Sequence, residues 1–188
     1  LVEAKQTIPH FYLTADIGMD ALLKVRAEAN AAAPKQDGEP AYKISVNDFI
    51  IKALALALKR VPAANAIFAE DRILRFQRAD IGVAVALEGG LLTPVIRAAG
   101  ALNLAGISRK IADLAERTRT NKVSPDELSG GTFTLTNTGS RGALFDTPIL
   151  VPPQAAMLGT GAIVKRPRVI ADGAGNESIG VRSVCYLP

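Results

Sequence analysis

A polar segment between Gly130 and Gly142 holds the residues of this 188-residue chain that are best suited to chemistry. Threonines alternate with apolar residues up to Thr136, which is the period-two pattern of a half-buried strand. Asn137 and Ser140 follow where glycines interrupt regular structure, so hydroxyl and amide groups lie beside a flexible backbone. Such a place can bind a polar ligand. From these residues alone, an edge strand followed by a tight turn is the simpler interpretation.

Other catalytic and metal-binding patterns find little support. One histidine, His10, and one cysteine, Cys185, are too few for a zinc site, so no metal is expected. There is no Walker loop, and no Gly-x-Gly-x-x-Gly motif opens a helix after a strand. A Ser-His-acid triad would need His10, which lies in a predicted strand; a packed histidine bonded to a carbonyl is favoured there. Asp126 and Glu127 are interpreted as helix-capping residues.

Composition limits the classes of partner. The formal charge is +4 and the basic residues are scattered, and with only nine aromatic side chains nucleic-acid binding is disfavoured. A phosphorylated small molecule suits the charge equally well. No segment has the roughly 18 uninterrupted apolar residues of a membrane span, and no leader opens the chain, so a cytoplasmic protein without a membrane partner is expected. The single cysteine fits a reducing compartment.

The elements that must position the polar segment mix helices with strands. The chain starts as the tail of a helix and stops inside an apolar run, so residues 1–188 are expected to form one domain truncated at both ends. A Ser-x-x-Asp capping box at Ser45 precedes a helix that is apolar on nearly every side and is expected to be buried between layers. The order of elements predicts an α/β sandwich with a mixed β-sheet. Helices are predicted over 19–32, 49–60 and 104–118, and strands over 8–17, 73–76, 81–87, 91–96, 155–164, 167–171 and 178–187.

Five motifs in register carry a family resemblance: Ile8–Phe11 with Leu23–Arg26, Lys43–Phe49 with Lys52–Ala53, Gly90–Val95, Gly130–Asn137, and Thr147–Ile149 with Pro152–Ala155. They cover almost the whole chain. With them the chain resembles the catalytic domain of the dihydrolipoamide acyltransferases, the core component of the 2-oxo acid dehydrogenase complexes. By fold it resembles the chloramphenicol acetyltransferases, which implies a two-layer sandwich. Residues 43–66 look like one bacterial branch and residues 129–188 look like actinobacterial members.

The resemblance implies transfer of an acyl group between dihydrolipoyl-lysine, carried on a separate domain, and coenzyme A. Acetyl is the expected group, because the closest resemblance is to members of the pyruvate dehydrogenase complex. In the family a histidine takes the proton from the attacking thiol, and a hydroxyl donates a hydrogen bond to the oxyanion. By motif position that hydroxyl belongs to Thr136. The positions expected to contact coenzyme A are Arg26, Ser45, Asn137, Gly161 and Ile163.

One departure from the family concerns the base, which lies in a His-x-x-x-Asp-Gly motif that these 188 residues do not contain. Little or no transferase activity is therefore expected from this chain alone. The family implies a homotrimer, larger cages of trimers, and association with the decarboxylase and dihydrolipoamide dehydrogenase components of the complex. A non-catalytic scaffold protein of the same fold is an alternative that explains the missing base. A basic-surface binder is a third, and salt-dependent DNA retention would be needed to support it.

Overall fold

The polar segment lies inside a mixed four-stranded sheet in the computed structural model, which describes residues 1–188. Its strand, β10 (Phe133–Asn137), runs parallel to β6 (Ile81–Val83) on one side and to β11 (Met157–Thr160) on the other. β9 (Val95–Ile96) pairs antiparallel with β6. The mixed sheet is confirmed, whereas the edge-strand interpretation is wrong. The alternation of threonines with apolar residues suggested that the threonine face is exposed to solvent. In the structure, the hydroxyls of Thr132 and Thr134 form hydrogen bonds inside the protein instead.

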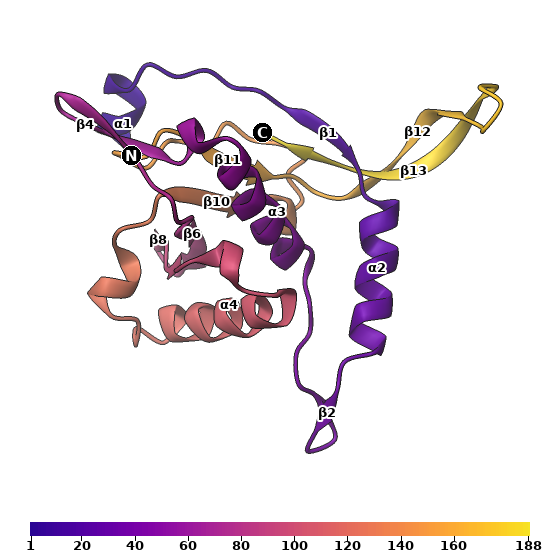
Figure 1. The fold of residues 1–188 in the computed structure, drawn as a ribbon, viewed down its shortest axis with the longest axis horizontal. Helices are drawn as coiled ribbons and strands as arrows, with labels where there is room; N and C mark the ends of the chain where they lie inside the picture. The colour runs from indigo at the N-terminus through magenta and orange to yellow at the C-terminus, as the bar shows by residue number, and fades with distance from the viewer.

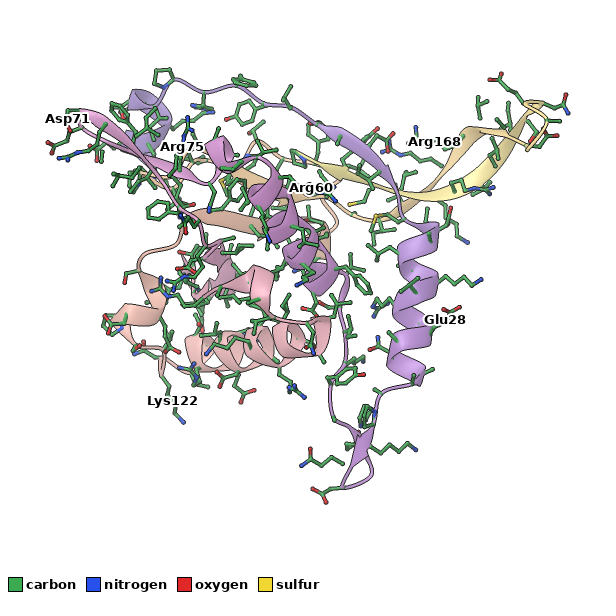
Figure 2. All side chains as sticks on the ribbon, in the orientation of Figure 1. Glu28, Arg60, Asp71, Arg75, Lys122 and Arg168 are labelled. Carbon is green, nitrogen blue, oxygen red and sulfur yellow. The ribbon has the colours of Figure 1, made fainter.

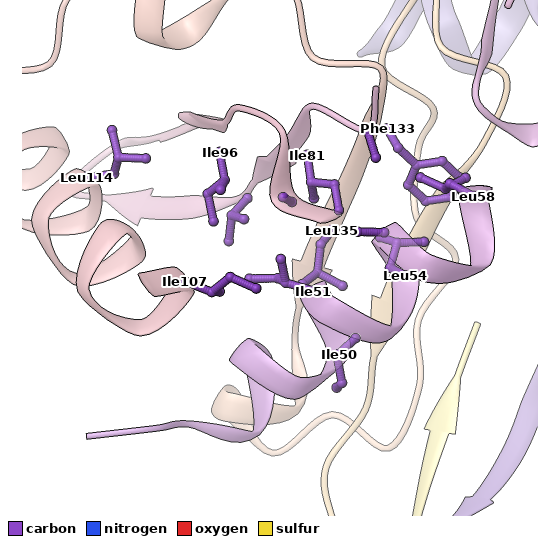
Figure 3. Packing of buried hydrophobic residues seen from close by; sticks show 14 residues of the cluster. Ile50, Ile51, Leu54, Leu58, Ile81, Ile96, Ile107, Leu114, Phe133 and Leu135 are labelled. Carbon is purple, nitrogen blue, oxygen red and sulfur yellow. The ribbon is translucent and has the colours of Figure 1, made fainter. Parts of the chain in front are cut away.

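Two helices, α3 (Val46–Arg60) and α4 (Leu104–Arg119), pack against one face of this sheet (Figures 1 and 3). Ile51 of α3 and Ile107 of α4 are fully buried and meet Leu135 of β10 in one core cluster. Burial of each such side chain contributes about 1.5–3 kcal/mol. The cluster comprises Ile50, Ile51, Leu54, Ala55, Leu58, Ala79, Ile81, Val83, Ile96, Ala99, Ile107, Leu114, Phe133 and Leu135.

α3 is buried on one side only. Its Leu56 is 46% exposed, and Lys59 and Arg60 lie in its last turn in solvent. The prediction that this helix is covered on nearly every side is therefore wrong, because α3 forms an outer layer of the domain. The predicted helices near the chain middle are otherwise confirmed, including the Ser45 capping box and the span of α4.

A second, antiparallel sheet projects from the body of the molecule, with strand order β1-β13-β12 (Figure 1). β12 (Val164–Ala171) and β13 (Glu177–Leu187) form a long hairpin, and its predicted turn at 172–176 is confirmed by a hydrogen bond from the Asp172 N–H to the Asn176 carbonyl. β1 (Ala15–Gly18) pairs with the end of β13. Most of the strand predicted over 8–17 is therefore absent: residues 8–14 cross the molecule without a sheet partner.

α2 (Asp20–Ala31) confirms the helix predicted over 19–32, but it buries none of its residues. Val25, predicted on its apolar stripe, is 49% exposed. The helix lies to one side of the body and leads into the hairpin of β2 (Lys35–Gln36) and β3 (Glu39–Pro40) (Figure 1). The stripe of α2 thus has no complete cover within this chain.

The remaining elements are short. The predicted strand 81–87 is split at Ala84 into β6 and β7, and the strand predicted near 73–76 is half of a hairpin whose other half was missed. Of four basic side chains labelled in Figure 2, Arg60, Arg75 and Arg168 lie on separate elements and Lys122 lies in the loop after α4, which agrees with the predicted scatter of basic residues. None of the helices combines the length with the apolar character that a membrane-spanning helix requires. The elements not yet named are α1 (Val2–Thr7), β4 (Ala66–Ala69), β5 (Arg72–Arg75), β7 (Val85–Leu87), β8 (Gly90–Leu92), and the 3-10 turns η1 (Pro62–Ala64), η2 (Ala99–Ala101), η3 (Pro125–Leu128) and η4 (Gly139–Arg141).

Candidate active site

Thr136 lies near the C-terminal end of β10, where the strand emerges from the core. The three residues before it are buried, whereas Thr136 is half-buried. Its neighbours Thr134 and Asn137 are both held by side-chain hydrogen bonds, and the Thr136 hydroxyl makes none. The residue beside it on β11 is Gly159, and Pro188 lies over that glycine, since a Cβ there would be 2.7 Å from Pro188 Cγ. A hydroxyl that is fixed on a central strand and remains free can donate to a bound ligand.

Asn137 projects from the opposite face of the strand, toward α3, because successive side chains alternate. Its Nδ2 donates to Asn47 Oδ1 at 2.7 Å, and its Oδ1 accepts from the Ser140 N–H at 2.9 Å. The bond to Asn47 joins the strand end to the first turn of α3. Asn137 is therefore held by both its amide nitrogen and its amide oxygen. At this strand end, Thr136 lies on one face of β10 and Asn137 lies on the other.

Ser45 is the N-cap of α3 and is already engaged in structure. Its Oγ accepts from the Asp48 N–H at 3.2 Å, and Asp48 Oδ2 accepts from the Ser45 N–H at 2.7 Å. The reciprocal pair satisfies two backbone donors of the helix start. Asp48 is 1% exposed, and burial raises the pKa of its carboxyl against the opposing effect of these bonds.

Arg26 reaches the same corner from α2. Its Nε donates to the Ile44 carbonyl at 3.0 Å, directly before Ser45, while its terminal nitrogens form no ion pair or hydrogen bond. Asn30, one turn later on α2, brackets Ile44 with bonds to its N–H and its carbonyl. The structure thus brings Arg26, Ser45 and Asn137 to one end of α3, with a free guanidinium edge at the outer side.

Gly161 and Ile163 are placed differently from each other. Gly161 is buried beneath the backbone of the loop that follows β10: a Cβ there would lie 1.9 Å from the Leu144 carbonyl oxygen. Gly139 is in contact with it, since a Cβ at Gly139 would lie 2.1 Å from Gly161. Ile163 is 37% exposed on the connection to β12. The contacts therefore join Gly161 to the strand end but not Ile163, and the roles of both at the coenzyme stay predictions.

The opposite end of β10 is closed by hydrogen bonds. Thr134 is 1% exposed and donates to Gln154 Oε1 at 2.7 Å, and Gln154 Nε2 donates to the Gly131 carbonyl at 3.0 Å. Thr132 bonds to the backbone of Asp80. The hydroxyls of Thr132 and Thr134 are consumed by these bonds, which leaves Thr136 as the free one.

Asp80 anchors this closed end. Its carboxylate accepts from Arg78, from Arg97 and from the Ala98 N–H at 2.7 Å, and Arg97 also donates to the Gly130 carbonyl. Burial alone would raise the pKa of Asp80, but the bonds from Arg78 and Ala98 outweigh it and lower the pKa below its ordinary value. The network ties the start of β10 to the turn that follows β9.

The one histidine belongs to another group of residues. His10 Nδ1 contacts the Ile8 carbonyl at 2.5 Å and its Nε2 contacts the Tyr12 hydroxyl at 2.9 Å, so the carbonyl-bonded state predicted for it is confirmed. None of its partners lies at the Thr136 strand end. Cys185 is 1% exposed, and burial raises the pKa of its thiol. Because the thiolate is the nucleophilic form of cysteine, this environment disfavours a nucleophilic role. The strand end thus presents a hydrogen-bond donor with no imidazole bonded to it.

A profile of the family described as 2-oxoacid dehydrogenases acyltransferase (catalytic domain) matches residues 1–188. The chain belongs to this acyltransferase family. The dihydrolipoyllysine-residue acetyltransferase component of the pyruvate dehydrogenase complex from Mycobacterium bovis is 54% identical over an alignment of 188 positions that covers 99% of this chain and 34% of the relative. The chain therefore spans about a third of the length of the curated relatives that it matches.

Solved structures of acyltransferases share this fold. Dihydrolipoamide acetyltransferase of Azotobacter vinelandii, studied for the catalytic role of a serine, a histidine and an asparagine, superimposes with a TM-score of 0.90 at 29% identity, over 100% of this chain and 74% of that one. A cubic core of the pyruvate dehydrogenase multienzyme complex gives 0.89 at 29% identity over the same shares. Chloramphenicol acetyltransferase, at 13% identity and TM-score 0.54 over 93% of this chain and 75% of that one, shares the fold alone, so the predicted fold class is confirmed.

Two residues of this acyltransferase chain gained importance only in the structure. Asn47 fell within a family motif, but its bond to Asn137 spans 90 positions and has no local sequence signal. Asp146, whose Oδ1 is buried without a hydrogen-bond partner, lies in an irregular segment for which the sequence predicted no role. The signal that could have found Asp146 is a charged residue in a stretch whose neighbours are apolar.

Proposed function

We propose that the chain is the catalytic domain of an acetyltransferase that moves an acetyl group between dihydrolipoyl-lysine and coenzyme A. The observation that carries this proposal is the free Thr136 hydroxyl at the end of a central strand, in a chain 54% identical to an acetyltransferase of the pyruvate dehydrogenase complex. Coenzyme A and the lipoyl group, on a separate domain, are the two substrates. The arrangement of Arg26, Ser45 and Asn137 around one end of α3 supports a site for the coenzyme.

The reaction is transfer of a thioester. The thiolate sulfur of one substrate attacks the carbonyl carbon of the acetyl thioester, a carbon–sulfur bond forms, and the carbonyl oxygen gains negative charge. Thr136 donates a hydrogen bond to that oxygen. The bond to the original sulfur then breaks, and the released sulfur takes the proton that the attacking thiol had lost. Loss of one such donor commonly costs on the order of 100-fold or more in rate.

The base in this proposal is a histidine outside the 188 residues. His10 is held by Ile8 and Tyr12, and the family resemblance implies that the base comes from a His-x-x-x-Asp-Gly motif. The histidine studied in the A. vinelandii acetyltransferase supports this requirement. In this proposal the 188-residue chain supplies the hydrogen-bond donor of the site but not the base. It is one domain of a longer polypeptide and has little or no activity alone.

A homotrimer completes the proposed site, with the histidine of one subunit facing Thr136 of the next. Support comes from apolar side chains that the chain leaves uncovered. Phe11 and Leu13 on the N-terminal arm are 80% and 74% exposed, and Ile179 and Val181 on the projecting hairpin are 80% and 63% exposed. Large apolar side chains exposed on two segments that extend from the body support association with other copies of the chain.

Assembly of trimers into a larger core is supported by the similarity to a cubic core of the pyruvate dehydrogenase complex. The further partners in this proposal are the decarboxylase and dihydrolipoamide dehydrogenase components. A cytoplasmic location is proposed on the ground of the single, unpaired cysteine.

Acetyl transfer from acetyl-CoA to dihydrolipoamide tests the proposal. We expect turnover by the full-length polypeptide and little or none by the 188-residue chain at equal concentration. Comparable turnover by the 188-residue chain would show that no further base is needed. A folded full-length polypeptide that transfers no acetyl group would favour the non-catalytic scaffold instead.

A further inference from the structure

Asn137 has its side-chain amide fixed in one orientation by two partners. Its Oδ1 accepts from the Ser140 N–H at 2.9 Å, and its Nδ2 donates to Asn47 Oδ1 at 2.7 Å. A backbone N–H can only donate, so the amide oxygen must face Ser140 and the amide nitrogen must face Asn47. Because that nitrogen can also only donate, Asn47 in turn presents its oxygen. The bond between the two side chains therefore has a defined direction.

Asn47 offers this oxygen from a rigid place. It lies in the first turn of α3, which the capping box of Ser45 and Asp48 closes with two hydrogen bonds. The residue before the cap, Ile44, is held by Asn30 of α2 through both its N–H and its carbonyl. Since the start of α3 is fixed on both sides, the Asn47 oxygen is a fixed acceptor for the strand end.

The Asn137 amide nitrogen has a second hydrogen beyond the one that bonds to Asn47. An amide nitrogen carries two hydrogens, and only one of them is used within the chain. Asn137 and Asn47 are both half-buried, so this pair of amides is not sealed inside the core. The second N–H is thus a donor that a ligand can reach, and the bond to Asn47 sets its direction.

The position of Asn137 in the chain indicates what this donor would meet. It follows Thr136 directly at the end of β10, and residues in a strand are spaced about 3.4 Å apart along its axis. The two side chains lie on opposite faces, so a ligand that bonds to Thr136 passes the strand end before it reaches Asn137. In acetyl-CoA the part next to the thioester is the pantetheine arm, whose amide carbonyls are acceptors for an N–H.

We propose that Asn47 is a positioning residue for acetyl-CoA, whose Oδ1 directs the Asn137 N–H toward an amide carbonyl of the pantetheine arm. This inference rests on the proposed function. Asn47 itself touches no substrate atom. Without its oxygen the Asn137 amide is less well ordered before binding, so acetyl-CoA binds more weakly. The Thr136 hydroxyl on the other face still stabilises the oxyanion, so the effect falls on KM and not on kcat.

The experiment compares Asn47→Leu and Asn47→Asp with the wild type in the full-length polypeptide, with acetyl-CoA and dihydrolipoamide varied separately. Leucine has a similar volume but no acceptor, whereas aspartate keeps an oxygen at the accepting position. We expect Asn47→Leu to raise KM for acetyl-CoA roughly five- to tenfold, and to leave kcat and the KM for dihydrolipoamide within about twofold of the wild type. An unchanged KM for acetyl-CoA overturns the inference.

A neutral substrate tests which part of the coenzyme is bound. S-Acetylpantetheine keeps the arm and lacks the nucleotide and its phosphates. Asn47→Leu should lower kcat/KM for this substrate by the same factor as for acetyl-CoA. Asn47→Asp should restore the wild-type value, because the substrate has no phosphate for the new carboxylate to repel. A loss that appears with acetyl-CoA alone would contradict the assignment to the pantetheine arm.

A double-mutant cycle tests whether Asn47 acts through Asn137. Asn137→Ala should raise KM for acetyl-CoA by a similar factor, and Asn47→Leu should then change it by less than about twofold further, since there is no amide left to direct. Losses that multiply independently in the double variant would show that Asn47 acts by another route, and would overturn the proposal.

Asn103→Ala is the control for loss of stability. Asn103 caps α4 by accepting from the Gly106 N–H at 2.8 Å, and it has no bond to Asn137. We expect Asn103→Ala to lower Tm by roughly 2–4 °C and to leave KM for acetyl-CoA unchanged. An equal rise in KM for this control would identify the effect of Asn47→Leu as structural and contradict the proposal. Absence of transfer by the wild type would instead overturn the proposed function.

Discussion

Thr134 and Thr136 are the same residue type on the same face of one strand, yet their surroundings are opposite. Thr134 is 1% exposed and its hydroxyl is bonded to Gln154, whereas Thr136 is half-buried and its hydroxyl is free. The difference arises from neighbours contributed by other segments: a buried glutamine accepts a hydrogen bond from Thr134, whereas no neighbouring side chain bonds to Thr136. Residue type and spacing alone do not separate a structural threonine from a catalytic candidate.

The largest stability effect is expected at Asp80, which anchors the closed end of β10. Asp80→Ala removes an acceptor for Arg78, Arg97 and the Ala98 N–H, so we expect a loss of roughly 3 kcal/mol in the free energy of unfolding, as for hydrogen bonds to a charged group. Urea denaturation at neutral pH measures it. A loss below about 0.5 kcal/mol would mean that the network does not hold the strand.

The same site predicts a pH dependence. Because the pKa of Asp80 is lowered in the folded protein, its stabilising contribution is present above the ordinary carboxyl range of about pH 4 and is lost as the pH falls below it. The difference in free energy of unfolding between wild type and Asp80→Ala should therefore shrink as the pH falls below about 4. A difference that stays constant over this range would contradict the assignment.

The next largest effect is expected at Thr134. Thr134→Val keeps the shape of the side chain but leaves Gln154 Oε1 buried without its donor, which should cost about 1–3 kcal/mol. Combining it with Gln154→Leu in a double-mutant cycle should recover part of that loss, with a coupling of at least about 0.5 kcal/mol. Strictly additive losses would show that the two side chains do not interact.

The smallest effect is expected at Ser45, where the α3 cap meets the open strand end. Ser45→Ala removes the acceptor for the Asp48 N–H and should lower the free energy of unfolding by about 1 kcal/mol. Ser45→Asp, which can cap the helix, should recover most of it. If Ser45→Ala changes only the KM for acetyl-CoA and not stability, Ser45 is a ligand-binding residue in the first place.

Local signals made part of this structure predictable. The Ser45 capping box, the 3.6-residue periodicity of α4 and the Asp172–Asn176 turn each lie within a few residues of the feature that they specify. The position of β10 could not be predicted in this way, because its partners β6 and β11 lie about 50 residues earlier and 20 residues later. The strand propensity of residues 8–14 did not produce a strand for a similar reason. Only the residues that follow them, Ala15–Gly18, pair with another strand, β13.

The candidate site shows the same limit. The threonine pattern located the strand end, but family resemblance was needed to select Thr136 among three similar residues. Neither source indicated the bond between Asn137 and Asn47, nor the unpaired carboxylate of Asp146, since both depend on segments that meet only in the folded chain.

The most direct test of the contrast between the two threonines is the kcat of acetyl transfer for Thr136→Val and Thr134→Val in the full-length polypeptide, with unfolding measured on the same samples. We predict that Thr136→Val loses about 100-fold or more in kcat with unchanged stability, that Thr136→Ser retains activity, and that Thr134→Val loses stability while its kcat stays close to that of the wild type. A Thr136→Val protein with wild-type kcat would contradict the account.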